Sequence, residues 1–420
     1  MRKLLVFGRS GDSVWLKLAP LMAAAFLIYW GDAMMSFWVP GLLEESLGGG
    51  LWMGLVMAFS SVVGLSMDML LPQIVRKVKV TNFYVMACLV GMGFALIMGL
   101  SSHWPLVLWF LVGMAVWGVY YELLLFANQQ YVSETVTTEQ RPGAWAMLHS
   151  VGSLAYVIGP VSAGVLLGLG VEKMIAAVIG LVVVGLFMVI VVVPKRREQE
   201  IEVKVHHMSL VVELTHWRDL MPRVWPILLM SLTIVLIDSA FWSVGAVFAD
   251  KLAEESWWGG FWLSAYMLPS LVAGLLVTRW SIAKGKKRWA AKFLGFGGLT
   301  LSLLGGPIGL PLQVVAVFAS GMFLALSIPL LDAVYTDLLV RMGRERKHLI
   351  GLTAAMGSFA YVIGPVLAGG LSDMLSERMV FVVMGLAAFV LSLVLLILMP
   401  RKLKLPREKI EGWETAEKKK

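Results

Sequence analysis

The stretch "GSLAYVIGPVSAGVL" at residues 152–166 returns as "GSFAYVIGPVLAGGL" at residues 357–371, 205 positions later, with three mismatches in fifteen. Other landmarks repeat at nearly the same distance. Asp32 in "IYWGDAMMSFW" corresponds to Asp238 in "VLIDSAFWSV", and "LLEESLGGGLWMG" has its counterpart in "LAEESWWGGFWLS". The chain therefore consists of two related halves that follow one another in the same order.

Both halves are unusually apolar. Hydrophobic residues make up 59% of the 420 positions and charged residues 15%, whereas soluble domains have about 45–50% and 25%. Twelve apolar runs reach the length of about 20 residues that spans a bilayer. They cover residues 18–42, 51–75, 81–101, 105–132, 145–169, 174–194, 225–249, 259–282, 290–310, 312–340, 349–371 and 378–400. We expect an all-α integral membrane protein with twelve transmembrane helices, arranged as two pseudo-symmetric six-helix bundles around a central cavity.

The basic residues indicate the topology. With both chain ends on one side, all but three of the 35 Lys and Arg fall on that same side; the exceptions are Lys173, Lys251 and Arg378. The positive-inside rule makes that side cytoplasmic. The net charge of +8 is then a topology signal, and no nucleic-acid partner is expected. We predict a multi-pass protein of the cell (plasma) membrane with both termini in the cytoplasm.

The domain boundaries follow from the spans. We expect an N-terminal bundle over 1–194, a cytoplasmic linker over 195–223, a C-terminal bundle over 224–402 and a charged tail over 403–420. The linker contains an amphipathic segment that we expect to lie on the membrane surface. Its apolar residues at helical spacing are Leu210, Leu214, Trp217 and Met221.

The duplicated organisation resembles that of the major facilitator superfamily over essentially the whole chain. The two copies of the opening stretch resemble the "GPxxG" motif of its drug and proton antiporter branch. The residues that carry this resemblance are Gly159, Pro160, Ala163 and Gly164 in the first copy and Gly364, Pro365, Ala368 and Gly369 in the second. Small residues recur every four positions around them, which favours close helix packing. We expect a packing role for these residues, while the antiporter assignment rests on the resemblance.

A second motif lies between the second and third spans, in "GLSMDMLLPQIVRKVKV" at residues 64–80. It resembles the signature of the superfamily through Gly64, Asp68 and Arg76, although Met69 stands where the family usually has a basic residue. The resemblance implies a conformational latch. We expect Asp68 to interact with a helix end rather than with substrate.

Four acidic residues lie within the spans. Asp32 and Asp238 are near the middle of the first and seventh, and Glu122 and Asp332 are in the cytoplasmic halves of the fourth and tenth. A charged side chain at mid-bilayer costs about 2.5–3.5 kcal/mol, so such residues usually face a cavity and serve a function. The resemblance implies that these four spans line the central cavity. We predict that the four acids bind substrate or couple transport to protons.

Aromatic residues flank three of these acids, and no Lys or Arg lies deep in any span. Carboxylates with aromatic faces favour lipophilic or aromatic cations, whereas phosphate or carboxylate substrates usually require a fixed cation. The aromatic residues expected to line the substrate cavity are Tyr29, Trp30, Trp117, Tyr121, Phe241 and Trp242.

Three functions remain open at this point. The first is a secondary transporter that works by alternating access and exports lipophilic or cationic molecules in exchange for protons. The second is a symporter or facilitator of a neutral solute such as a sugar or nucleoside, with Asn128, Gln129 and Gln130 as polar contacts. The third is a lipid-handling or assembly factor that transports nothing.

The sequence offers no signal for an enzyme, because no nucleotide-binding loop or nucleophile triad is present. We expect no cofactor and no metal site: Cys88 is the only cysteine, and the adjacent His206 and His207 lack further ligands in the sequence around them. The expected partners are a small-molecule substrate, protons and membrane lipid. We expect the protein to be a monomer.

Overall fold

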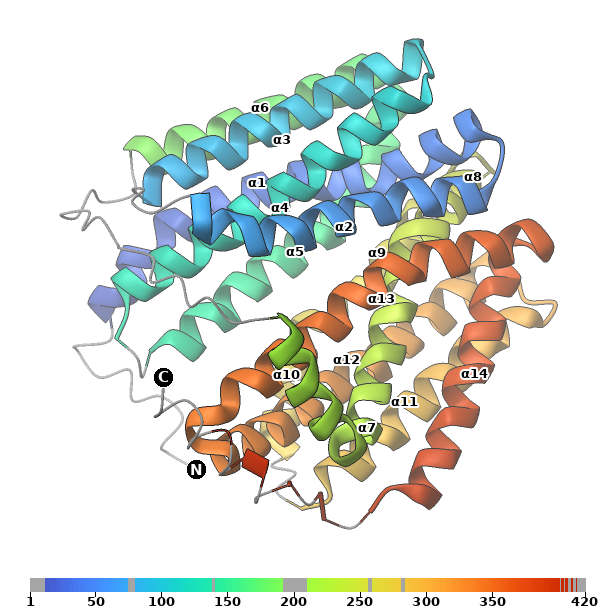
Figure 1. Ribbon diagram of the computed structural model, residues 1–420. Helices are drawn as coiled ribbons and strands as arrows, with labels where there is room; N and C mark the ends of the chain where they lie inside the picture. The colour runs from blue at the N-terminus through green and yellow to red at the C-terminus, as the bar shows by residue number, and fades with distance from the viewer. Residues whose placement is uncertain are drawn as a thin grey trace. The chain divides into compact units, whose positions relative to one another are not determined.

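A computed structural model describes residues 12–74, 80–137, 140–191, 210–255, 259–280 and 284–400, together with 402, 403, 405, 406, 409, 410 and 413. Every regular element in these residues is a helix (Figure 1). The predicted all-α membrane fold is confirmed.

The helices of the first half each follow one predicted span. They are α1 (Asp12–Leu47), α2 (Gly50–Ile74), α3 (Val80–His103), α4 (Val107–Thr135), α5 (Arg141–Leu167) and α6 (Val171–Val191).

Some spans of the second half are built from shorter pieces. The elements are α7 (Leu210–Ala240), the π-helix η1 (Phe241–Gly245), α8 (Ala246–Glu255), α9 (Gly259–Met267), α10 (Ser270–Trp280), α11 (Lys286–Ser302), the 3₁₀ turn η2 (Leu303–Gly305), α12 (Leu310–Met342), the 3₁₀ turn η3 (Gly343–Glu345), α13 (Arg346–Met374) and α14 (Glu377–Leu398). The seventh span is α7, η1 and α8, and the eighth is α9 and α10.

Eleven segments of the described chain are long and apolar enough to cross a membrane. The one predicted span not among these eleven is the ninth, 290–310, which corresponds to α11; this helix has only 17 residues and continues into η2. The helix starts earlier than expected, at Lys286, because its basic first turn lies outside the apolar run; Gly285 immediately before it adopts a positive φ of 75°.

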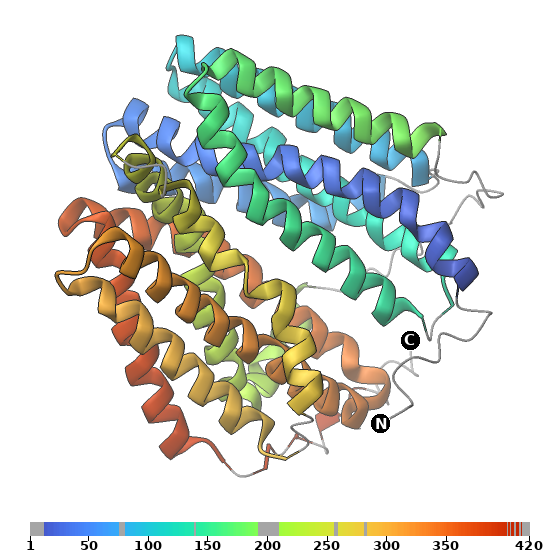
Figure 2. The ribbon, with the colours of Figure 1, turned by 180° about the vertical axis from the view of Figure 1, so that it is seen from behind.

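The chain divides into two compact units. One comprises the described residues of Met1–Gly48, Leu55–Val205 and Ala249–Ser264, and the other those of Gly49–Gly54, His206–Phe248 and Ala265–Lys420. In the first unit α1 packs against α5 and α6, and α3 packs against α4 and α6. In the second, α7 packs against α13 and α14, and α11 against α12 and α14 (Figures 1 and 2). The duplicated sequence thus produces the same set of helix neighbours twice.

Two short segments, Gly49–Gly54 and Ala249–Ser264, belong to the unit formed mainly by the other half of the chain. Each makes specific hydrogen bonds within that unit. Asp373 on α13 accepts the backbone N–H groups of Gly50 (2.6 Å) and Leu51 (2.9 Å), and so caps the first turn of α2. This contact joins residues 49–54 to the second unit. In the first unit, the Ser264 hydroxyl on α9 donates to the Val157 carbonyl on α5 at 2.6 Å.

The repeated stretch places its glycines where helices approach closely. A Cβ atom on Gly159 of α5 would lie 2.4 Å from the Cβ of Ala33 on α1. In the second unit, a Cβ on Gly364 of α13 would lie 2.9 Å from the Cβ of Ser239 on α7. Only glycine allows these separations, because non-bonded carbon atoms normally lie about 3.5–4.0 Å apart. Close packing at these positions holds α1 to α5 and α7 to α13.

The amphipathic part of the predicted linker is continuous with a spanning helix. Residues 210–223 form the first turns of α7, with Leu214 and Met221 exposed. The indole N–H of Trp217 donates to Glu213 Oε1 at 2.8 Å. The rest of the linker lies outside the described residues.

Candidate functional site

Asp32 is the centre of a buried hydrogen-bond network in the first unit. It lies on α1, and the residue is 5% exposed. Its Oδ1 accepts the indole N–H of Trp117 at 3.0 Å, and its Oδ2 accepts the hydroxyl of Tyr121 at 2.9 Å. The hydroxyl of Tyr156 on α5 donates to the same Oδ2. One carboxylate therefore joins α1 to both α4 and α5, and these three donors are all neutral.

The rings around Asp32 support one another. Trp117 stacks on Phe94 of α3, with ring centroids 5.0 Å apart and an interplanar angle of 5°. Trp117 and Tyr121 are one helical turn apart on α4, which places both donors on the same side of that helix. The stacking fixes the indole so that its N–H remains directed at the carboxylate.

Asp238 has a similar arrangement in the second unit. It lies on α7 and is half-buried. Its Oδ1 accepts the hydroxyl of Tyr266 on α9 at 2.9 Å, and its Oδ2 accepts the hydroxyl of Tyr361 on α13. Tyr266 stacks on Phe241, with centroids 3.8 Å apart. Phe241, expected in the cavity, thus positions a donor to Asp238.

A π-helical turn begins three residues after Asp238, at Phe241. The helix widens over η1, where the hydroxyl of Ser243 donates to the backbone carbonyl of Ser239 at 2.8 Å. Single π-helical turns within α-helices are rare and occur frequently at functional sites. In the first half, α1 remains α-helical around Asp32, so the two aspartates lie in different backbone settings.

Of the tyrosines that bind the two aspartates, Tyr121 was among the predicted cavity residues, whereas Tyr156, Tyr266 and Tyr361 were not, although the sequence contained a signal for Tyr156 and Tyr361. Tyr156 and Tyr361 occupy the same position of the repeated stretch, 205 residues apart, and Asp32 and Asp238 are 206 apart. Each half therefore contains the same Asp–Tyr pair. Tyr266 had no such signal, because it has no counterpart in the repeated stretch and its hydroxyl meets Asp238 only in the folded chain.

The other expected aromatic residues have separate surroundings. The Tyr29 hydroxyl accepts the side-chain N–H of Asn128 at 2.8 Å, and Tyr84 donates to the Asn128 carbonyl at 2.8 Å. Trp30 donates to Ser162 on α5 at 2.8 Å. Trp242 is half-buried in η1.

Trp30 lines a cavity of about 380 Å³ among α1, α5 and α6. The wall is almost entirely apolar, and besides the Trp30 indole N–H its polar side chain is Ser162. The lining residues are Leu27, Trp30, Met34, Ser162, Leu166, Ala177, Gly180, Leu181 and Val184. Trp30 and Asp32 therefore face different surroundings within the first unit.

Glu122 and Asp332 are outside the two aspartate networks. Glu122 lies beside Gly64 of α2, where a Cβ would be 3.2 Å from its Oε1. Gly118, one turn earlier on α4, meets the backbone of Ser60, so α2 and α4 are in close contact here. Asp332 is exposed on α12. The structure groups Glu122 with the signature glycine rather than with Asp32.

The predicted latch is only partly described. Gly64 is buried in α2, and Asp68 lies in the same helix. The side chain of Asp68 and the whole of Arg76 lie outside the described residues, so the latch stays a prediction. Pro160 and Pro365 both lie within continuous helices, α5 and α13.

Comparisons with known proteins give the family. The family model of the Major Facilitator Superfamily matches residues 121–339 and 256–420. No curated protein sequence matches the chain. Solved structures match its fold over nearly its full length, at identities that carry information on fold alone.

Three of these structures, all of them transporters, illustrate the match. The peptide transporter POT in complex with sulfate has a TM-score of 0.70 at 14% identity, covering 92% of this chain and 94% of its own. The nucleoside transporter NupG has 0.66 at 13% identity, covering 90% and 98%. A bacterial homologue of the iron transporter ferroportin in inward-facing state has 0.65 at 17% identity, covering 91% and 99%. The chain belongs to the Major Facilitator Superfamily, a family of multi-pass membrane transporters rather than enzymes.

Proposed function

We propose that this transporter exports lipophilic or cationic small molecules in exchange for protons, by alternating access. The observation that carries the proposal is the pair of membrane-embedded carboxylates, Asp32 and Asp238. Each occupies the equivalent position in its half and accepts only neutral donors among the hydrogen bonds described above. A carboxylate held without a fixed cation can exchange a proton for a cationic substrate.

The chemistry of the exchange is local to each unit. An ionised carboxylate accepts hydrogen bonds with both oxygens, whereas a protonated one has an O–H that must donate. When a proton binds Oδ2 of Asp32, one of its two tyrosine hydroxyls must turn from donor to acceptor or leave. Proton binding thereby changes how α1 is joined to α4 and α5.

The same step in the second unit acts on α7, α9 and α13. Tyr266 and Tyr361 each hold one oxygen of Asp238. Protonation of Asp238 alters one of these two bonds, next to the widened turn η1. We propose that these changes, produced by protons or by a competing cation, bias the helices toward different arrangements, as alternating access requires.

The surfaces near the acids support the proposed substrate class. Tyr121 and Tyr361 are 37% and 38% exposed, so a π-face or hydroxyl remains accessible beside each carboxylate. Aromatic faces attract cations within about 6 Å of the ring centroid, with a gain of about 0.5–2 kcal/mol. We expect a monovalent aromatic or lipophilic cation to compete with protons at these sites.

The alternative of a neutral solute is less well supported. Both functional groups of Asn128 are used between Tyr84 and Tyr29, and the residue is 3% exposed. The Gln130 amide lies 3.3 Å from Glu134 one turn along α4. Two of the three amides expected to contact a neutral solute therefore already serve contacts within the protein.

The test uses purified protein in liposomes with an internal pH dye and an imposed pH gradient. Ethidium serves as the aromatic cation and uridine as the neutral solute. We expect ethidium to drive proton movement, and Asp32→Asn and Asp238→Asn each to reduce this flux at least about tenfold, corresponding to about 1.4 kcal/mol. Neutral amides keep the shape of the site and remove the proton exchange.

Asp337→Asn is the matched control, because Asp337 is an exposed carboxylate on α12 that pairs with Lys286 at 2.8 Å. Its flux should equal that of the unmodified protein. If uridine causes a proton flux and ethidium does not, the protein is a symporter of a neutral solute and the exporter proposal is rejected. If neither compound causes a proton flux in folded protein, transport of both classes is rejected and a lipid-handling or assembly factor is favoured.

A further inference from the structure

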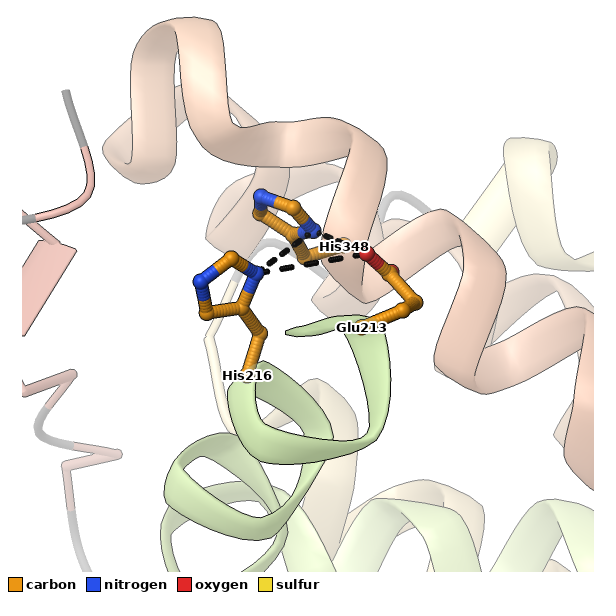
Figure 3. Close-up of side chains that lie close together, drawn as sticks. All are labelled: Glu213, His216 and His348. Atoms are coloured by element: carbon orange, nitrogen blue, oxygen red, sulfur yellow. Dashed lines mark hydrogen bonds and ion pairs between the residues drawn. The ribbon is translucent and has the colours of Figure 1, made fainter. Parts of the chain in front are cut away.

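Two histidines and a glutamate converge where α7 and α13 begin, in the second unit. Glu213 and His216 lie one turn apart on α7, and His348 lies in the first turn of α13 (Figure 3). One ligand atom from each residue lies within 4.8 Å of the other two. Glu213 and His216 are near the start of α7 and Asp238 is near its end, and the proposed exchange does not use the cluster.

The distances within the cluster lie on either side of those between the ligand atoms of a metal site. The His216 and His348 Nδ1 atoms are 3.3 Å apart, and Glu213 Oε2 is 2.7 Å from His348 Nδ1 and 4.0 Å from His216 Nδ1. Ligands of a tetrahedral Zn²⁺ with bonds of about 2.0–2.1 Å lie about 3.3 Å from one another. The two histidine atoms already have that separation, whereas the Glu213–His348 distance must lengthen and the Glu213–His216 distance must shorten to reach it.

The outer contacts orient the ligands as metal sites require. The Nε2 of His348 lies 3.0 Å from Oε2 of Glu345, and both residues are 1% exposed. An Nε2–H donated to this carboxylate leaves the lone pair of Nδ1 directed into the cluster. Trp217 donates to the second oxygen of Glu213 at 2.8 Å. A carboxylate behind a ligating histidine is the usual outer partner in metal sites.

The side chain of Trp413, near the C-terminus, packs against the cluster. The Trp413 ring lies 4.3 Å from the ring of His216 and 5.5 Å from that of His348, centroid to centroid. Lys409 pairs with Asp219 of α7 at 2.5 Å, which holds this part of the C-terminal segment nearby. Limited access to water strengthens the attraction between a cation and its ligands.

We propose that Glu213, His216 and His348 bind a first-row divalent transition metal, with Zn²⁺ as the representative ion. Two imidazole nitrogens and one carboxylate oxygen suit zinc and its neighbours in the first row rather than Mg²⁺ or Ca²⁺, which prefer oxygen ligands. The ion ties the start of α7 to the start of α13. These two helices also carry Asp238 and Tyr361, so metal binding stabilises the helix pair that holds the second carboxylate.

The test is direct metal binding by the full-length protein, purified in detergent without a histidine tag and stripped with a chelator. Zn²⁺ is titrated calorimetrically, and Co²⁺ is added separately to record its visible absorption. We expect one Zn²⁺ per chain and a tetrahedral Co²⁺ spectrum. His216→Gln and His348→Gln should each abolish both signals, and Glu345→Gln should weaken Zn²⁺ binding about 10- to 100-fold.

His103→Gln is the matched control, because His103 is an exposed histidine whose contact with Glu172 is long, at 3.9 Å. It should bind Zn²⁺ like the unmodified protein. Thermal unfolding checks each variant; if the buried His348 proves necessary for folding, the partly exposed His216→Gln decides. Equal binding by His216→Gln, or no binding by the folded unmodified protein, would overturn the site and leave a hydrogen-bonded histidine pair. Neither readout depends on transport activity.

Discussion

The carboxylates of Asp32 and Asp238 receive unequal numbers of donors. Asp32 accepts from Trp117, Tyr121 and Tyr156, whereas Asp238 accepts from Tyr266 and Tyr361. A hydrogen bond to a charged group contributes about 1.5–3 kcal/mol. The shared Asp–Tyr pair is therefore the minimal arrangement in each half, and the donors from α4 and α9 distinguish the two sites.

Double-mutant cycles test these pairs. Tyr156→Phe removes the donor but keeps the ring, so we expect it to lower the free energy of unfolding by about 1–3 kcal/mol. Combined with Asp32→Asn, the loss should differ from the sum of the two single losses by at least about 0.5 kcal/mol, since the residues are in contact. Thermal unfolding in detergent provides the measurement.

The cross-combination supplies the control for this cycle. Tyr361 donates to Asp238, so Tyr361→Phe should add to Asp32→Asn and couple only with Asp238→Asn. Additivity within the Asp32 and Tyr156 pair would show that their hydrogen bond contributes nothing specific to stability.

At the scale of helices, the repeated stretch lets two helices pack closely at some of its glycines. A Cβ on Gly159 of α5 would collide with the backbone and Cβ of Ala33, whereas a Cβ on Gly164 of the same helix would have nothing within 4 Å. One motif thus contains a glycine that packing requires and another that it does not. The difference arises because Gly159 faces α1 and Gly164 does not.

Two alanine substitutions separate these glycines. Gly159→Ala should destabilise the protein by about 1–3 kcal/mol, since an extra methyl group in a packed contact forces α5 away from α1. Gly164→Ala should be neutral or stabilise by up to about 1 kcal/mol, because alanine is the better helix former. Unfolding midpoints of the two purified variants give the comparison. Equal effects would mean that the α1–α5 contact can relax around a methyl group.

For the whole molecule, the proposed topology places both ends of the chain in the cytoplasm. Cys88 is the only cysteine and is buried, so single cysteines introduced elsewhere can report on sidedness in a Cys88→Ala background. Exposed positions exist at both ends of the helices, among them Glu172 in the first turn of α6, Gly309 before α12 and Lys402 after α14. Gly309 also tests whether the short α11 crosses the bilayer.

We expect a membrane-impermeant maleimide to label Glu172→Cys and Gly309→Cys in intact cells. Lys402→Cys should react only after the cells are permeabilised. The Cys88→Ala protein without added cysteines is the blank. Labelling of Gly309→Cys from the cytoplasmic side would show that α11 does not span, and labelling of Lys402→Cys in intact cells would reverse the proposed orientation.

Several properties were determined by the sequence alone. The length of each apolar run matches the thickness of the bilayer. Each run forms a helix, because backbone groups in lipid must be hydrogen-bonded within the segment. The duplication can also be read directly from the sequence, and it shows that Asp32 and Asp238 occupy equivalent positions in the two halves. The limits of the shortest span, α11, were misplaced, since its first turn is strongly basic and the chain after its last turn is 3₁₀.

Tertiary structure alone decided which side chains meet. Asp32 and Tyr156 are 124 positions apart, and Glu213 and His348 are 135 apart. Their contact depends on how each helix is rotated and on how closely the glycine contacts let the backbones approach. Hydropathy shows that a helix is buried in the membrane and leaves its rotation undefined, because residues on every face of such a helix are apolar. For this reason the sequence located the acids, while the packed helices selected their hydrogen-bond donors and assembled the histidine cluster.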